Sequence, residues 1–157
     1  MRMGDIKRQR KKYQTPKKPW DKKRIDMENE LLKEYGLRRK REIWRSEAIL
    51  RGIRKQAKEL SAVEDPEKME KLFERVKRLG LVGDNPTLDD LLELTVRDIL
   101  ERRLQTILFR KGLANTPKQA RQFIVHKHVM VGEKKIRWPS FLVPKDLEDK
   151  IKVDLEK

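Results

Sequence analysis

Apolar residues recur at helical spacing along most of the chain. Over residues 37–60 they fall on one stripe, which predicts a long amphipathic helix. The residues of this stripe are Ile43, Leu50, Ile53, Ala57 and Leu60. The same spacing predicts shorter helices over 25–34, 66–79, 88–94, about 96–110 and from 117 onward. The chain from residue 25 to about residue 125 is therefore predicted to be mainly helical.

Residues suited to capping mark the ends of these helices. Asp65 and Thr116 each stand directly before a proline, which is typical of an N-cap followed by the first helical residue. Thr87 and Thr95 are suited to cap the helices that follow them. Glycine ends helices because it adopts the left-handed backbone conformation without strain. The glycines at predicted helix ends are Gly36, Gly80 and Gly112.

The period of the pattern changes after residue 128. Short β-branched pieces alternate with turn residues, which predicts a small antiparallel sheet. The pieces are V-M-V (129–131), K-I-R (135–137), F-L-V (141–143) and I-K-V (151–153), with G-E-K (132–134) as the first turn. The predicted fold class is α+β. A mainly helical N-terminal body precedes a C-terminal ααβ module in which two helices pack on the small sheet.

The charge of the chain is strongly positive and unevenly distributed. The 157 residues include 41 Lys and Arg against 26 Asp and Glu, a formal net charge of +15. Residues 1–24 and residues 102–153 each carry +9, whereas residues 25–101 carry −2. We therefore divide the chain into a basic extended arm (1–24), a helical body (25–101), the basic ααβ module (102–153) and a C-terminal tail (154–157), which is predicted to be cut short.

This charge predicts a polyanionic partner, and nucleic acid is the first candidate. An anionic membrane is the second, but no stretch approaches the roughly 18 consecutive apolar residues of a spanning helix. No apolar run of the signal-peptide type follows the basic N-terminus, so we expect a soluble protein that is not exported. The chain has no cysteine, which excludes disulfides, thiolate zinc sites and cysteine nucleophiles.

Two predicted helices of the module carry cations opposite their apolar sides. Arg103, Thr106 and Arg110 are spaced three and then four residues apart and are predicted to share one side of the first helix. Lys118, Arg121 and Gln122 are predicted to point outward from the second. Together, the two helices are predicted to form a clamp for phosphate groups. Further candidates in the module are Lys111, Thr116, Lys127, His128, Lys134, Lys135 and Arg137.

Basic residues outside the module are also candidates for binding nucleic acid. The arm offers cations to phosphate groups and an aromatic ring to a base or sugar, although a solubilising tail is the alternative. Its candidates are Lys11, Lys12, Lys17, Lys18 and Trp20. Residues 38–58 of the long helix carry nine cations against Glu42 and Glu47, and a merely solvated helix face is the alternative there. Its candidates are Arg38, Arg39, Arg41 and Arg45.

His126 and His128, the only histidines of the chain, do not predict a metal site. A closed site usually needs four ligands, and no acidic or sulfur ligand stands near them in the sequence. Catalysis would need an oriented carboxylate or nucleophile, which is also missing. We expect no metal and no cofactor. One histidine is expected to pack or cap locally, and the other to join Lys127 in hydrogen-bonding phosphate or ribose.

Residues 102–143 resemble the RNA-binding module of the ribosomal protein S4 family. The signature of that module matches, in order, at Arg103 and Leu104, Arg110 and Gly112, Ala120 and Arg121 with Phe123 and Ile124, His128 with Val129 and Val131, Gly132 with Lys134 or Lys135, and Pro139 and Ser140. Upstream, P-W-D-K-K-R-I, Y-G-L-R-R-K-R-E-I-W-R and L-T-V-R-D-I-L-E-R-R-L-Q-T resemble the archaeal and eukaryotic form of the family. The resemblance thus covers nearly the whole chain.

The sequence departs from the bacterial pattern of the family at four points. Gln105 stands where aspartate is common, Lys127 replaces a glycine, and the asparagine that often precedes the turn glycine is absent. These three departures resemble the archaeal and eukaryotic branch. The fourth is the lack of an N-terminal cysteine cluster, which removes any expectation of zinc.

The resemblance implies a structural protein of the small ribosomal subunit, located in the cytoplasm. Such a protein binds small-subunit ribosomal RNA directly and early in assembly, contacts neighbouring ribosomal proteins and supports decoding accuracy. It has no small-molecule substrate. Two alternatives use the same module: an RNA-modifying enzyme of the pseudouridine synthase type, and a stand-alone ribosome-associated factor. The enzyme reading is disfavoured because the residues before the module contain no plausible active-site cluster.

Overall fold

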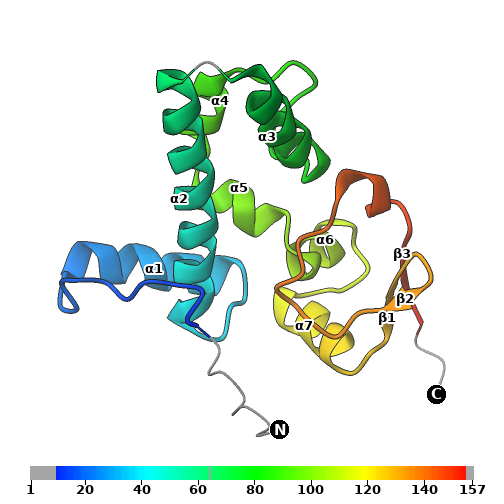
Figure 1. The fold of residues 1–157 in the computed structure, drawn as a ribbon. Helices are drawn as coiled ribbons and strands as arrows, with labels where there is room; N and C mark the ends of the chain where they lie inside the picture. The colour runs from blue at the N-terminus through cyan, green and yellow to red at the C-terminus, as the bar shows by residue number, and fades with distance from the viewer. Residues whose placement is uncertain (1–9, 64, 155–157) are drawn as a thin grey trace, which may run out of the picture.

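The computed structural model describes residues 10–63 and 65–154, and in these ranges helices come first and a small sheet last (Figure 1). The helices are α1 (Lys22–Glu34), α2 (Lys40–Ala62), α3 (Pro66–Arg78), α4 (Leu88–Glu93), α5 (Val96–Glu101), α6 (Leu104–Arg110) and α7 (Pro117–Val125). The strands are β1 (Val129–Val131), β2 (Lys134–Lys135) and β3 (Ile151–Val153), with a 3-10 turn at Lys145–Leu147. The predicted α+β class is confirmed.

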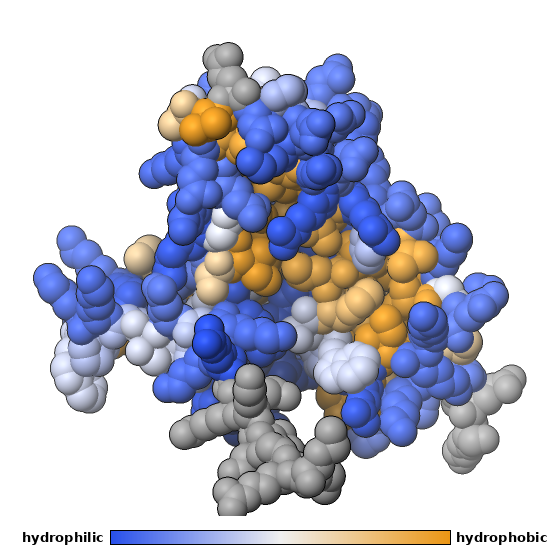
Figure 2. Space-filling view, in the orientation of Figure 1, coloured by the Kyte–Doolittle hydropathy of each residue, from blue (hydrophilic) through white to orange (hydrophobic). Residues whose placement is uncertain are grey.

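A first core lies between α2 and the helices that cover it. It consists of Leu50, Ile53, Ala57, Leu60, Leu72, Val76, Leu91, Leu94 and Ile99, from α2 to α5. The apolar stripe predicted for the long helix is confirmed, because all five of its residues are buried. In the space-filling view, hydrophobic residues show in the hollow in the middle of this face, and hydrophilic residues cover most of the rest (Figure 2).

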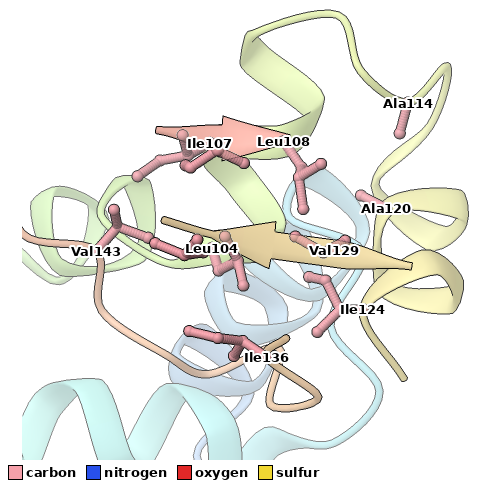
Figure 3. Close-up of a cluster of buried hydrophobic side chains, with 11 residues drawn as sticks. Leu104, Ile107, Leu108, Ala114, Ala120, Ile124, Val129, Ile136 and Val143 are labelled. Carbon is pink, nitrogen blue, oxygen red and sulfur yellow. The ribbon is translucent and has the colours of Figure 1, made fainter. Parts of the chain in front are cut away.

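A second core joins α6 and α7 to the sheet (Figure 3). Its residues are Leu104, Ile107, Leu108, Ala114, Ala120, Ile124, Val129, Val131, Ile136, Val143 and Ile151. The sheet has the order β2-β1-β3, and both pairings are antiparallel. Val129 and Val131 of the central strand are buried, whereas Met130 between them is half-buried. This is the predicted ααβ arrangement of two helices packed on a small sheet.

Most of the predicted helix starts are confirmed by side-chain caps. Asp65 accepts a hydrogen bond from the backbone N–H of Lys68, and Thr116 accepts one from Gln119. Thr87 and Asp90 form a reciprocal capping box. At Thr95, the carboxylate of Asp98 instead accepts from both the backbone N–H and the hydroxyl of the cap residue. Two helix starts differ from the predicted ones, since the first helix begins at Lys22 and the long one at Lys40.

The predicted single helix over 96–110 is wrong, because α5 ends at Glu101 and α6 begins at Leu104. The predicted strand over 141–143 is also wrong. That segment lies outside the sheet and runs along the break between α5 and α6, where Phe141 O accepts from Leu104 N at 2.8 Å. Val143 N in turn donates to Arg102 O at 3.0 Å. The backbone groups freed by the helix break are thus satisfied by this segment.

Strand β2 ends at Lys135, two residues before the predicted end, although Ile136 N still donates to Val129 O at 3.1 Å.

Within residues 10–63 and 65–154, no helix combines the length and the apolar character that crossing a bilayer requires.

Candidate RNA-binding surface

A cavity of about 290 Å³ lies where the helical body meets the ααβ module. Its lining comes from four parts of the chain: Tyr13 of the arm, Arg39, Arg41, Glu42 and Arg45 at the start of α2, Arg103 and Arg121 of the module, and Pro139 and Ser140 of the segment after β2. We call it the arginine cavity. Five guanidinium groups and one carboxylate line it, so it attracts anions.

Glu42 is the carboxylate that organises the arginine cavity. Its Oε2 accepts hydrogen bonds from Arg103 Nη2 at 2.6 Å and from Arg121 Nη1 at 3.1 Å. Burial on its own raises the pKa of Glu42, but the hydrogen bonds and charges of Arg121 and Arg103 outweigh burial and hold that pKa below its usual value of 4.5. Glu42 therefore stays ionised and ties the first turn of α2 to the module.

Arg103 lies at the base of the arginine cavity with only 3% of its surface exposed. Its Nε atom has no hydrogen-bond partner within the described residues. Burial lowers the pKa of Arg103, and the charge and hydrogen bond of Glu42 oppose that shift. A buried guanidinium that keeps an unused donor is disposed toward a further anion.

The prediction that Arg103, Thr106 and Arg110 share an exposed side is wrong. Because α5 and α6 are separate helices, Arg103 is the N-cap of α6 and is buried, instead of lying on the outer side of one continuous helix. Thr106 is buried, and its hydroxyl donates to Leu100 O at 2.7 Å. Arg110 is exposed and pairs with Glu101 at 2.8 Å, outside the arginine cavity. Of the predicted clamp, the structure brings Arg103 and Arg121 together in this cavity, whereas Arg110 and Lys118 do not line it.

Gln105 holds the module against the turn between α1 and α2. This buried side chain donates from Nε2 to Tyr35 O at 3.1 Å, to Gly36 O at 3.1 Å and to Pro117 O at 2.9 Å. Its Oε1 lies 3.4 Å from Arg121 Nη1 and accepts a hydrogen bond from it. Gln105, which stands where the bacterial pattern commonly has aspartate, thus supports Arg121 of the arginine cavity.

Some of the other candidate side chains of the module are engaged in ion pairs or capping, and the rest are exposed to solvent. Lys111 donates to Glu148 O at 2.6 Å and pairs with Asp149 at 3.2 Å, and Lys135 pairs with Asp154 at 3.5 Å. Thr116 serves as the N-cap of α7. The remaining side chains are exposed on the module: Lys118, Gln122, Lys127, Lys134 and Arg137. Of the described residues other than glycine, only Lys127 has a positive φ, of 64°, which suits the place where the bacterial pattern has glycine.

The histidines occupy the end of α7 and the start of β1. His128 is half-buried, its Nδ1 lies 3.1 Å from Asp154 O, and its ring makes an edge contact with Phe123. His126 is exposed and stacks on the His128 ring with 6.3 Å between centroids. His128 is therefore the locally packed residue of the pair. Within the described ranges, no group of three or more His, Cys, Asp or Glu side chains is arranged to hold a metal ion.

The described part of the arm, from residue 10, folds back onto the helical body. The ring of Tyr13 packs on Trp44 with 6.0 Å between centroids, and Gln14 Oε1 accepts from Arg51 at 2.6 Å. Arg24 donates to the carbonyl groups of Lys18 and Pro19. The candidate side chains of the arm and of the start of α2 that are exposed here are Lys11, Lys12, Lys17, Lys18, Trp20, Arg38, Arg39, Arg41 and Arg45.

Glu42 and Tyr13 line the arginine cavity, although neither is among the residues predicted for the site. A carboxylate inside so basic a run as residues 38–45 is the signal that indicates Glu42 as a partner for buried arginine. For Tyr13 the signal was weaker, because an aromatic residue in a basic arm predicts contact with nucleic acid as readily as packing on the body.

Comparison with known proteins gives two findings. The family model described as the S4 domain matches residues 102–149. Small ribosomal subunit protein uS4 of Picrophilus torridus is 51% identical over 155 residues, which are 95% of this chain and 85% of the relative. The uS4 protein of Nanoarchaeum equitans is 51% identical over 149 residues, 92% of this chain and 83% of the relative. The uS4 protein of Thermoplasma acidophilum is 49% identical over 155 residues, which are 95% of this chain and 78% of the relative.

Proposed function

Because this chain belongs to the family of small ribosomal subunit protein uS4, we propose that it is a structural constituent of the small ribosomal subunit that binds small-subunit ribosomal RNA directly. It is not an enzyme. Its partners are ribosomal RNA and neighbouring ribosomal proteins, and its place is on the ribosome in the cytoplasm. It organises RNA folding early in subunit assembly and supports decoding accuracy.

The main support for RNA binding by this chain is the arginine cavity. Five guanidinium groups converge there from the body and the module, and Glu42 neutralises only one of their charges. Planar guanidinium groups suit phosphate oxygens because they donate two parallel hydrogen bonds. A phosphate group in this cavity would contact body and module together, so RNA would hold them in one arrangement.

We assign the candidate residues to three parts of one interface. The centre is the arginine cavity, with Arg39, Arg41, Arg45 and Arg121 at its walls and Arg103 at its base. One flank is the exposed edge of the module, with Lys118, Gln122, Lys127, Lys134, Lys135 and Arg137. The other is the start of α2 with Arg38, together with the arm through Lys11, Lys12, Lys17, Lys18 and Trp20. These side chains read the backbone and shape of RNA rather than base edges.

Five candidates have a smaller part in this proposal. Thr106 and Thr116 have their hydroxyl groups engaged in supporting the fold. Arg110 and Lys111 are paired with carboxylates, so RNA contact there has to compete with an existing ion pair. His128 is held by the backbone of Asp154, which leaves Lys127 as the exposed donor of that segment.

Binding to transcripts tests the proposal. The purified chain is titrated against archaeal small-subunit and large-subunit ribosomal RNA at 100 to 400 mM salt. The expected result is preferential binding to the small-subunit RNA, with an affinity that falls steeply as salt rises. Equal affinity for both RNAs would contradict it. Stoichiometry separates a constituent from a reversible factor, because a constituent stays at one copy per small subunit through a high-salt wash.

A further inference from the structure

Trp138 exposes 58% of its residue surface on the module. A single exposed apolar side chain is ordinary on a protein surface and carries no argument alone. Three features distinguish Trp138 from an ordinary exposed residue. Its backbone is anchored by hydrogen bonds on both sides, the next two residues line the arginine cavity, and a guanidinium group lies over its ring.

The backbone that carries Trp138 is anchored on both sides. Before it, Ile136 is buried in the second core and its N–H donates to Val129 O at 3.1 Å. After it, Phe141 N donates to Trp138 O at 3.1 Å, and Phe141 O accepts from Leu104 N at 2.8 Å. The segment is thus tied to β1 and to the first turn of α6. An exposed ring on such a segment is presented in a defined place, and little backbone freedom is lost on binding.

The arginine cavity begins at the residue that follows Trp138. Pro139 and Ser140 line the cavity, and consecutive Cα atoms are about 3.8 Å apart. The guanidinium carbon of Arg137 lies 5.2 Å from the centre of the Trp138 ring, within the range of a cation–π contact. An aromatic ring with a cation over it therefore directly precedes, in the chain, two residues that line a cluster of five guanidinium groups.

This combination matches a single nucleotide whose base has left its helix. A base inside an A-form helix is stacked on both faces and offers none of them to a protein ring. We propose that Trp138 is a stacking platform for one unpaired base of the bound RNA, and that an adjoining backbone phosphate enters the arginine cavity. This inference rests on the proposed function and adds to it the class of RNA feature recognised: a bulged, looped or junction nucleotide.

A neighbouring protein covering Trp138 is the competing occupant, since tryptophan and arginine are both common at the centre of protein interfaces. The surroundings favour RNA. The cavity that Pro139 and Ser140 line, directly after Trp138 in the chain, carries five guanidinium groups against one carboxylate. A protein surface would have to supply several buried carboxylates to match that charge, whereas one phosphodiester and its neighbours supply it by their nature.

The first test measures affinity with the full chain and an archaeal small-subunit ribosomal RNA transcript. Trp138→Ala is expected to weaken binding roughly fivefold to 150-fold, the range for loss of one base–aromatic stack. Trp138→Phe keeps an aromatic face and is expected to stay within about threefold of the wild type. The matched control is Met27→Ala, because Met27 has 59% of its side chain exposed on α1 and does not line the cavity. Circular dichroism verifies that all variants are folded.

The second test locates the base. The complex is irradiated with ultraviolet light, digested with trypsin and nuclease, and read by mass spectrometry. A nucleotide adduct is expected on the tryptic peptide 138–145, and the same adenine or cytosine should react with dimethyl sulfate in the free RNA, which identifies it as unpaired. Unchanged affinity of Trp138→Ala, or an adduct on a paired nucleotide, overturns the platform and leaves RNA binding intact. Failure of the wild type to select small-subunit RNA instead overturns the proposed function.

Discussion

Arg103 Nη2, in the module, donates to Glu42 Oε2, on α2, across a distance of 2.6 Å. The two residues are 61 positions apart in the chain, and their side chains are 3% and 17% exposed. Arg121 joins the same carboxylate oxygen from α7. The helical body and the module are thus fastened to each other by the carboxylate that also organises the arginine cavity.

Replacing Glu42 with glutamine should destabilise the protein. The change leaves the guanidinium of Arg103 buried without a counter-charge, and breaking a largely buried ion pair in this way costs about 2–3 kcal/mol, given partial exposure of the carboxylate. Urea denaturation at pH 7 measures the free energy of unfolding. Glu59→Gln is the control, because its carboxylate is 62% exposed and, among the described residues, pairs with the exposed Lys55 alone. A loss no larger for Glu42→Gln than for Glu59→Gln would refute the structural role of this pair.

The stabilisation from Glu42 should disappear in acid. Its folded-state pKa lies below the usual 4.5, so its contribution is complete above pH 4.5 and falls as the pH drops through the folded-state pKa. The difference in unfolding free energy between the wild type and Glu42→Gln should therefore be constant from pH 7 to about pH 5 and shrink at lower pH. Urea denaturation at pH 7, 5.5, 4.5 and 3.5 measures this difference. A gap that stays constant down to pH 3.5 would show that the carboxylate charge is not its source.

Two glycines should respond to alanine in opposite directions. Gly36 has a φ of +58°, and a Cβ there would lie 2.7 Å from Pro117 Cβ, so Gly36→Ala should destabilise the protein by about 2 kcal/mol or more. Gly52 lies inside α2 with nothing within 4 Å of the Cβ that alanine adds. Gly52→Ala should stabilise the protein by about 0.5–1 kcal/mol. Thermal denaturation compares them, and a shift of both midpoints in the same direction would contradict this assignment.

Removing one cation from the arginine cavity should reduce the salt dependence of RNA binding. Arg45 is exposed and lines the cavity, so Arg45→Gln should lower the slope of log affinity against log salt by about 0.7–0.9. Titration with a small-subunit RNA transcript at several salt concentrations measures the slope. Arg78→Gln, an equal loss of charge at the end of α3 and outside the cavity, should leave the slope unchanged. Equal slopes for the two variants would remove Arg45 from the interface.

Local pattern was enough to predict most elements of this fold, but it missed the break between α5 and α6 and placed a strand over 141–143 that the sheet does not contain. The stripe on the long helix is buried as its spacing predicts, because helical periodicity places residues on one face regardless of what that face meets. Asp65 and Thr116 cap helices because their side chains reach backbone groups only three residues away. The S4-type module, too, was predicted from motifs within residues 102–143. The division of the chain into arm, body, module and tail stays a prediction.

The arrangement of the arginines was decided by contacts between distant segments. Arg103 and Arg110 are seven residues apart and would share a side of one continuous helix. The chain breaks between α5 and α6 because the segment 141–143 supplies hydrogen bonds to the break, and no pattern near residue 103 reveals that partner. Burial of Arg103 then depends on Glu42, 61 positions away. Periodicity reports which face is apolar, but the burial of a charge depends on which counter-charge the fold brings to it.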